Sequence, residues 1–299
     1  MASEIDKARA NRFRQYKKNS QSANVWRRFR RNKNSLIGMI CLTIIIAAVC
    51  SADFFYDYET CAIKQNITER LKPPFSPGHI LGTDDLGRDV AARVLHGGRR
   101  SLLISFSSVA ISLTVGTILG AVAGYYGKTV DNVIMRCIDI LMAIPMTMLA
   151  IVIVAALGAS IRNMIIALAI AQIPSFARVV RSSVLSVRDL EYIEAARALG
   201  AKDGTIIFGH VLPNVLSPVI VQIAIRAATA ITNAAALSFL GLGVRVPVPE
   251  WGSMLSLGRA YIRDYSYLTF IPGLAMMLTI LSLNLLGDGL RDALDPRLK

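Results

Sequence analysis

Apolar residues in this chain come in six continuous blocks, each of the length that crosses a lipid bilayer. The blocks cover residues 35–55, 101–124, 133–158, 163–180, 213–240 and 268–287. A helix of about 20 apolar residues spans the roughly 30 Å hydrocarbon layer. The fourth block is interrupted by Gln172 and Pro174, which a membrane helix tolerates where neighbouring helices or water satisfy the freed groups. The pattern predicts an all-α polytopic membrane protein with six transmembrane helices.

Basic residues predict how these helices are oriented. Residues 1–34 hold eleven Lys and Arg against two acids, which places the N-terminus in the cytoplasm. Six crossings then put the C-terminus and the connections 125–132 and 181–212 inside. The connections 56–100, 159–162 and 241–267 lie outside. We interpret the net charge of +13 as a signal of topology and of contact with anionic lipid. Burial in the membrane argues against nucleic-acid binding.

The chain divides into three parts on this basis. Residues 1–34 form a cytoplasmic N-terminal segment, in which Trp26, Phe29 and the surrounding arginines predict an interfacial helix. Residues 35–100 hold the first transmembrane helix and an outer loop. Residues 101–299 form a transmembrane core that includes the cytoplasmic loop 181–212.

A polar amphipathic segment lies between the fourth and fifth apolar blocks. Tyr192, Ala195, Ala196 and Leu199 follow the spacing of one helical face, while Glu191, Glu194 and Arg197 occupy the wet faces. Gly200 is expected to end this helix in a left-handed conformation, and Asp203 to cap a second helix that runs towards Leu212. A bent helical hairpin of this kind suits the docking of a soluble partner. The alternative is an amphipathic helix that is merely solvated.

The fifth block carries a polar stripe on an otherwise apolar helix. Its members are Gln222, Arg226, Thr229 and Asn233, spaced at i, i+4, i+7 and i+11. An arginine at the centre of a membrane helix costs about 2.5–3.5 kcal/mol on insertion scales, so it is expected to face water or a carboxylate. We interpret the stripe as the lining of a translocation pathway in which Arg226 attracts a carboxylate of the cargo. An ion pair with another subunit is the alternative.

No set of residues has the spacing of a catalytic or metal site. Residues 123–129 are similar to the end of a phosphate-binding loop, but Val122 stands where that loop needs glycine, and a membrane helix precedes it instead of a strand. The three histidines are scattered, and the four cysteines lack the spacing of metal ligands. We therefore expect a chain that is not an enzyme and binds no metal or cofactor of its own.

Several motifs together resemble one family. Residues 194–213, with Glu194-Ala-Ala, Gly200 and Leu212-Pro213, resemble the EAA-type loop of ATP-binding-cassette importer permeases, although His210 stands where isoleucine is usual. Residues 81–101, 238–243, 249–252 and 284–296 are similar to signatures of the C-type subunit of dipeptide and oligopeptide permeases. The resemblance runs from about residue 26 to residue 297, nearly the whole chain.

The resemblance implies a machine of several subunits in a bacterial plasma membrane. This chain is expected to pair with a second, similar permease, to sit above two cytoplasmic ATP-binding subunits that hold ATP and Mg, and to receive cargo from an outer solute-binding protein. The residues implied to couple to the ATPases are Tyr192, Glu194, Ala195, Ala196, Leu199 and Gly200. Those implied on the outer, binding-protein side are Asp84, Arg88, Asp89 and Trp251. Trp251 also has the alternative of an interfacial aromatic anchor.

Two alternatives concern the cargo and the energy source. Similar permeases import nickel chelates, glutathione or other small solutes, so the peptide cargo is one of several implied by the resemblance. A secondary transporter would also have six helices and a buried charge. It would need a protonatable group or ion site, and no Asp or Glu lies near the middle of a span, since Asp139 is close to a span end. It would also have no use for the helical hairpin.

Overall fold

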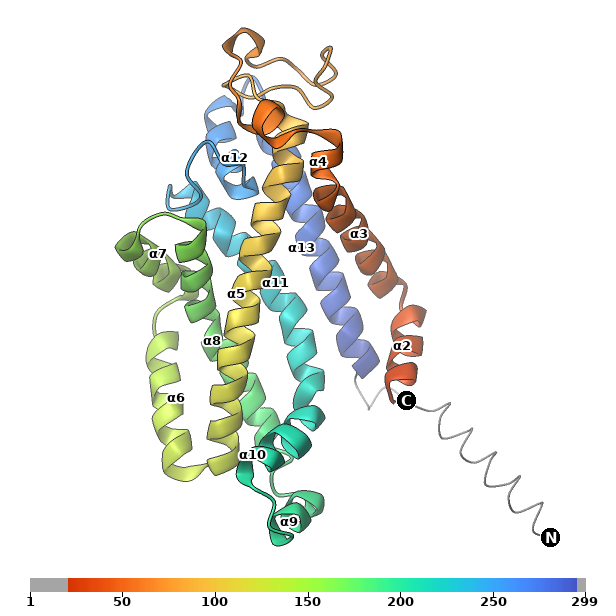
Figure 1. Cartoon of the computed structure of the whole chain (residues 1–299), viewed down its shortest axis with the longest axis vertical. Coiled ribbons are helices and arrows are strands. Elements are labelled where there is room, and N and C mark those ends of the chain that lie inside the picture. Colours follow the sequence, from red (N-terminus) through yellow and green to blue (C-terminus); the bar gives the residue numbers. More distant parts are fainter. Residues whose placement is uncertain (1–20, 295–299) are drawn as a thin grey trace, which may run out of the picture.

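The chain folds into a bundle of long helices, seen in a computed structural model that describes residues 21–294 (Figure 1). The helices are α2 (Gln21–Arg31), α3 (Lys33–Cys50), α4 (Ala52–Phe55), α5 (Val90–Tyr126), α6 (Lys128–Met142), α7 (Met146–Leu157), α8 (Ile161–Leu185), α9 (Glu191–Ala198), α10 (Asp203–Ile206), α11 (Leu216–Phe239), α12 (Trp251–Gly258) and α13 (Tyr267–Leu294). Short 3-10 or π turns cover Tyr58–Ile63, Ile67–Glu69, Ile207–Val211, Leu212–Val215 and Arg259–Tyr261. No strand occurs between residues 21 and 294, which confirms the expected all-α class.

Five helices are long and apolar enough to cross a membrane, and a sixth span results if α6 and α7 are counted together. These two helices are bent by 83° at the break between them, so the third expected span, 133–158, is not one straight helix. Pro145 precedes α7, and proline lacks the N–H that a continuous helix would need there. The fourth span is the unbroken α8, which carries Pro174 inside it.

The second span begins earlier than expected. Helix α5 starts at Val90 rather than at residue 101, so the expected boundary between residues 100 and 101 falls inside a 37-residue helix. Asp89 caps its first turn by accepting a hydrogen bond from the Ala92 N–H at 2.8 Å. Charged residues such as Arg93 lower the mean hydropathy of the first three turns of α5. These residues are buried against the preceding loop, and the sequence around them gives no local sign of that burial.

Helices α5 and α8 form the closest pair in the bundle. Gly116, Gly120 and Gly124 stand four residues apart on one face of α5, against α8. A Cβ at Gly120 would collide with the backbone carbonyl of Ala177, and one at Gly124 would lie 2.8 Å from the Val184 Cβ. Small residues let membrane helices approach until their backbones touch. The two helices therefore behave as one rigid unit.

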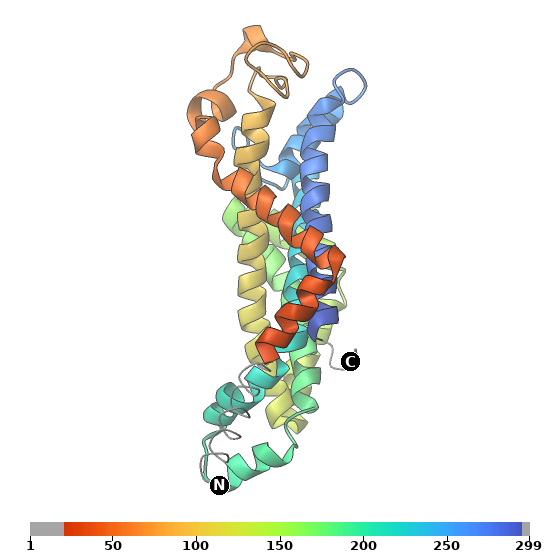
Figure 2. The same ribbon diagram turned by 90° about the vertical axis from the view of Figure 1, so that its right-hand side faces the viewer.

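The connections gather at two opposite ends of the bundle (Figures 1 and 2). At one end lies the long loop (residues 56–89), above α12. At the other end lies the connecting hairpin (residues 191–206), which consists of α9, a turn at Gly200 and α10. Helix α2 packs beside the last turns of α13, where Asn32 Nδ2 donates to Asp292 Oδ2 at 2.9 Å. The two described termini thus lie together.

Candidate functional site

The connecting hairpin has the local geometry that its sequence indicates. Helix α9 ends at Ala198, and Gly200 follows with φ of +81°, a backbone conformation that side chains with a Cβ rarely adopt. The Ala201 N–H donates to the Ala196 carbonyl at 3.1 Å, which satisfies one of the last carbonyls of the helix. The expected left-handed bend at Gly200 is therefore confirmed.

The hairpin is fastened to the bundle through buried aliphatic residues. Ile193 of α9 and Ile206 of α10 are fully buried, in one cluster with Val184 of α8 and Tyr125 of α5. Burying an isoleucine side chain stabilises a fold by about 1.5–3 kcal/mol. Two such residues, one from each arm, hold the hairpin against the ends of α5 and α8.

Polar groups add a second attachment. The Tyr125 hydroxyl donates to Asp203 Oδ1 at 2.8 Å, and the Arg197 guanidinium lies 5.7 Å from the centre of the Tyr125 ring. Hydrogen bonding to Tyr125 raises the pKa of Arg197, which remains charged. The expectation that Asp203 caps the second helix is wrong: Lys202 occupies the cap position, and the Asp203 side chain is directed to Tyr125.

The rest of the hairpin faces solvent. Leu199 is 88% exposed and Tyr192 is 43% exposed, with Ala195, Glu191 and Glu194 exposed beside them. Ala196 differs, because it is half-buried and packs on the cluster beneath the hairpin. The structure therefore brings five of the six residues expected to couple to an ATPase onto the outside of the hairpin or its turn: Tyr192, Glu194, Ala195, Leu199 and Gly200.

The polar stripe of α11 is only partly open. With its amide oxygen turned towards Arg226, Gln222 accepts hydrogen bonds from Nε at 2.8 Å and from Nη2 at 2.9 Å. Thr229 donates to the Ile225 carbonyl within its own helix. Asn233 is buried, 8% exposed, and its amide reaches the Met146 sulfur at 3.8 Å. The first three members share a half-buried face, whereas α7 covers the fourth.

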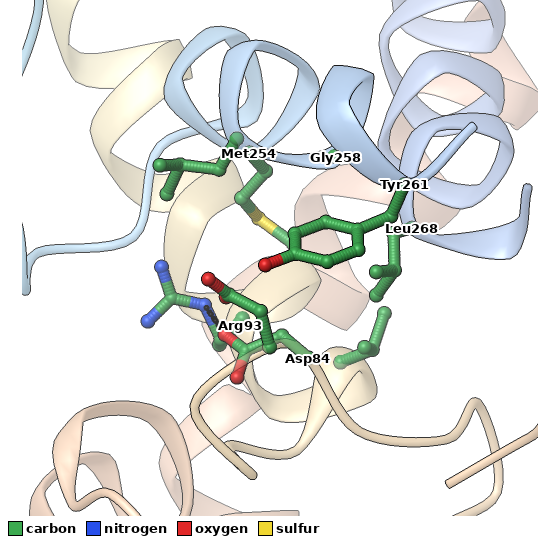
Figure 3. A pocket seen from close by; sticks show the side chains of 9 residues that line it. Asp84, Arg93, Met254, Gly258, Tyr261 and Leu268 are labelled. Atoms are coloured by element: carbon green, nitrogen blue, oxygen red, sulfur yellow. Dashed lines mark ion pairs between the residues drawn. The ribbon is translucent and has the colours of Figure 1, made fainter. Parts of the chain in front are cut away.

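The residues expected on the outer side are largely paired with one another. Asp84 Oδ2 accepts from Arg88 Nε at 2.7 Å and lies 3.3 Å from Arg93 Nε. Both arginines are buried, at 1% and 2% exposed. Figure 3 shows Asp84 beside Arg93, in a pocket that Met254 and Tyr261 also line. These charges hold the long loop onto α5, and Arg88 presents little surface to a partner.

Asp89 belongs to a second polar group of the long loop. Its Oδ2 lies 2.7 Å from His79 Nδ1, while the other His79 nitrogen lies 3.3 Å from Glu69. Lys72 Nζ donates to Glu69 Oε1 at 2.6 Å, and this bond, followed by the one to His79, lowers the pKa of Glu69. The group ties the tip of the loop to the first turn of α5.

Sequence reasoning missed the buried carboxylate of Glu250. It is 1% exposed and accepts from Ser101 Oγ of α5 at 3.0 Å and from Ser238 Oγ of α11 at 2.8 Å. It also caps α12 by accepting from the N–H groups of Gly252 and Ser253. Glu250 thereby joins three helices at the long-loop end. A carboxylate just before a short helix was the available local signal.

Trp251 follows Glu250 and is also buried. Its side chain is 1% exposed, and its Nε1 donates to the Val94 carbonyl of α5 at 2.8 Å. A tryptophan enclosed by its own chain does not anchor in the lipid interface, and its ring is not presented to a partner. Its place on the outer, binding-protein side stays a prediction. Trp251 is a packing residue between α5 and α12.

Comparisons with known proteins agree with this architecture. Residues 116–299 match the family described as the inner membrane component of binding-protein-dependent transport systems, and residues 20–74 match the N-terminal transmembrane domain of oligopeptide transport permease C. A dipeptide transport system permease of Alkalihalophilus pseudofirmus is 45% identical over 95% of this chain and 93% of its own. A glutathione transport system permease of Pectobacterium atrosepticum is 44% identical, with 92% and 90% covered.

A solved structure supports the fold. The methionine ABC transporter MetNI, in an inward-facing conformation, superposes with a TM-score of 0.56 over 68% of this chain and 96% of that chain, at 18% identity. The family match covers more than half of the chain, and the relatives cover nearly all of it. The resemblance inferred from the motifs is therefore confirmed, and the chain belongs to the family of inner-membrane permeases of binding-protein-dependent ABC transport systems.

Proposed function

We propose that the chain is the transmembrane permease subunit of an ATP-driven importer of dipeptides and oligopeptides in a bacterial inner membrane. The observation that carries this proposal is the connecting hairpin. It presents Tyr192 and Leu199 to solvent while Ile193 and Ile206 fix it to the bundle, in a chain of a transport permease family. An exposed apolar surface on a rigid support is what a soluble partner needs to push or pull on a membrane helix.

In this proposal the hairpin lies on the cytoplasmic side, together with both termini. The eleven basic residues of the first 34 support that orientation, as does the packing of α2 beside the last turns of α13. Two ATP-binding subunits dock on the hairpins of this chain and of a second, homologous permease. ATP and Mg belong to those subunits, and this chain is not catalytic. A solute-binding protein delivers cargo at the long-loop end.

The half-buried face of α11 lines the pathway in this proposal. Gln222 orients Arg226 through two hydrogen bonds but leaves its positive charge unbalanced. No carboxylate among residues 21–294 forms an ion pair with Arg226. A peptide carries a terminal carboxylate, which a guanidinium recognises well.

Reconstitution of the complete complex tests the function. The chain, its partner permease, the two ATPases and the solute-binding protein are placed in liposomes, and uptake of radiolabelled dialanine and of glutathione is measured. We expect vanadate-sensitive, ATP-dependent uptake of dialanine, and none by the chain alone. Uptake of glutathione and not of dialanine would indicate that the cargo is glutathione, as the name of the Pectobacterium relative says of that protein. Proton-driven uptake by the chain alone would establish a secondary transporter instead.

Two hairpin variants test the coupling. Gly200→Asp places a Cβ on a left-handed residue, and Glu194→Lys reverses an exposed charge on α9. Both are expected to leave the protein in the membrane while uncoupling ATP hydrolysis from uptake. Unchanged transport by both variants would remove the hairpin from the mechanism.

Arg226→Gln tests the pathway. If Arg226 attracts the terminal carboxylate, uptake of free dialanine falls, by about tenfold for about 1.4 kcal/mol, while uptake of amidated dialanine is little changed. Arg259→Gln is the control, because that guanidinium lies 4.6 Å from the Phe239 ring, outside the stripe. Equal losses for free and amidated peptide would exclude the carboxylate role.

A further inference from the structure

We propose that Tyr125 and Asp203 form a positioning contact that makes α5 the helix through which movement of the connecting hairpin reaches the long loop. This inference rests on the proposed function, since it names how that function is transmitted. It concerns two residues that belong neither to the polar stripe nor to the six hairpin residues expected to couple to an ATPase.

The contact lies where two separate parts of the chain meet. Tyr125 is in the last turn of α5, and Asp203 is the first residue of α10, 78 positions later. Tyr125 is 7% exposed and belongs to the buried cluster, and its hydroxyl donates to Asp203 Oδ1. Arg197 of α9 lies over the same ring. One tyrosine therefore contacts both arms of the hairpin.

Helix α5 is suited to carry movement because it is a single element. Its 37 residues make a rod of roughly 55 Å, since a helix rises about 1.5 Å per residue. At the far end, Asp89 contacts His79 and caps the first turn, and Arg93 Nη1 donates to the carbonyl of Ala62 at 2.7 Å. The rod is therefore fastened to the long loop at one end and to the hairpin at the other.

Contacts of α5 with α8 and with Arg188 strengthen this arrangement. Its glycines hold it against α8, and Arg188 Nη1, just before the hairpin, donates to the Gly124 carbonyl at 2.9 Å. Among the described residues, Arg188 forms an ion pair with its neighbour Asp189, which precedes the hairpin, and with neither arm. Tyr125, in contrast, makes polar contacts with both arms, through Asp203 and Arg197.

The test uses Tyr125→Phe, which removes one hydroxyl and keeps the buried ring. A hydrogen bond of this kind contributes about 1 kcal/mol, which changes the equilibrium between a hairpin attached to α5 and one detached from it about fivefold. In the reconstituted complex with dialanine as cargo, we expect the ratio of ATP hydrolysed to dialanine taken up to rise by up to about fivefold. Complex assembly and the rate of ATP hydrolysis stay close to the wild type.

Three matched variants complete the design. Thr114→Val removes a hydroxyl from the same helix that bonds only to the Ala110 carbonyl, so its ratio is expected to be that of the wild type. Asp203→Asn keeps an oxygen acceptor and should retain most of the coupling, whereas Asp203→Ala should raise the ratio at least as far as Tyr125→Phe, because it also removes the hydrogen bond between Asp203 and Tyr126. The effects of Tyr125→Phe and Asp203→Ala should add to less than their sum in the double variant, because both changes remove the hydrogen bond between Tyr125 and Asp203.

The outcomes separate this inference from the proposed function. A wild-type complex without ATP-driven uptake would refute the function itself. A transporting complex whose ratio is unchanged in Tyr125→Phe, or changed equally in Thr114→Val, would overturn the positioning contact alone. A proportional loss of both uptake and hydrolysis would also overturn it, because that result indicates a structural role.

Discussion

Glu250 offers the sharpest test of how the long-loop end of the bundle is held together. Replacing it with alanine removes both carboxylate oxygens from a site that is 1% exposed. Four donors then lose their acceptor: the hydroxyls of Ser101 and Ser238 and the N–H groups of Gly252 and Ser253. The hydroxyls can turn to a carbonyl in their own helices, but the two N–H groups of the first turn of α12 cannot.

The magnitude follows from those two N–H groups. Each buried donor left without a partner costs about 1–3 kcal/mol. Removing the charge also removes the penalty of keeping it buried, which offsets part of the loss. We expect Glu250→Ala to destabilise the chain by about 3 kcal/mol. Glu250→Gln keeps one oxygen acceptor for two of the four donors, and its expected cost is about 1 kcal/mol.

The assay is the apparent Tm of the purified complex in detergent. At roughly 2–4 °C per kcal/mol, Glu250→Ala should lower the Tm by about 6–12 °C and Glu250→Gln by about 2–4 °C. Glu59→Ala is the control, since Glu59 is exposed in the long loop and surface substitutions usually stay within about 0.5 kcal/mol. The reasoning fails if Glu250→Ala behaves like Glu59→Ala, or if the glutamine variant is as damaging as the alanine variant.

Three further predictions address the packing, the hairpin and the long loop. Gly120→Ala forces α5 away from α8 and should cost about 1–3 kcal/mol, whereas Gly204→Ala, with open space around it, should leave the Tm unchanged; equal shifts would contradict the close packing. Ile193→Ala should cost about 2–5 kcal/mol and expose the hairpin to limited proteolysis, while Ala195→Ser on the exposed side should not. Lys72 lowers the pKa of Glu69 from its ordinary value of 4.5. The ion pair therefore stabilises the folded long loop fully above pH 4.5, and this stabilisation is lost as the pH falls through the lowered pKa. Protection factors of the long-loop amides, corrected for the pH dependence of intrinsic exchange, should therefore fall in acid in the wild type and be less sensitive to pH in Lys72→Met.

The sequence predicted the elements whose signals are local. Six apolar blocks correspond to five long helices and one bent pair, because a membrane span must be apolar along its whole length. Gly200 was predicted to take a left-handed conformation, since few other residues end a helix as easily. Pro145 carried a usable signal for the break after α6, but the hydropathy of the third block ran through it unchanged.

The elements that were missed depend on contacts between distant positions. The first turns of α5 looked like loop because Arg93 and Arg99 interrupt the apolar pattern. Arg93 is balanced by Asp84 and by the carbonyl of Ala62, and Arg99 by Asp53 and the carbonyls at the end of α3. Those partners lie 9 to 50 positions away, so periodicity within one segment carries no sign of them. The burial of Trp251 and Glu250 was hidden for the same reason.

Arg226 is paired differently from the buried arginines of the long-loop end, and this difference bears on its role. The buried arginines of the long-loop end, Arg88 and Arg93, each have a carboxylate of the same chain within 3.3 Å. Arg226 is half-buried in a membrane helix, and its one polar partner among the described residues is the Gln222 amide, which accepts from two of its nitrogens without cancelling its charge. A guanidinium held in this way at the centre of a bilayer costs about 2.5–3.5 kcal/mol.

We infer that the counter-charge of Arg226 comes from outside the described part of the chain. A carboxylate of the partner permease would be present in every state, whereas a peptide carboxylate would be present only during transport. Arg226→Gln distinguishes them, because loss of a permanent pair weakens assembly of the two permeases, while loss of a transient one changes only the preference for free over amidated peptide.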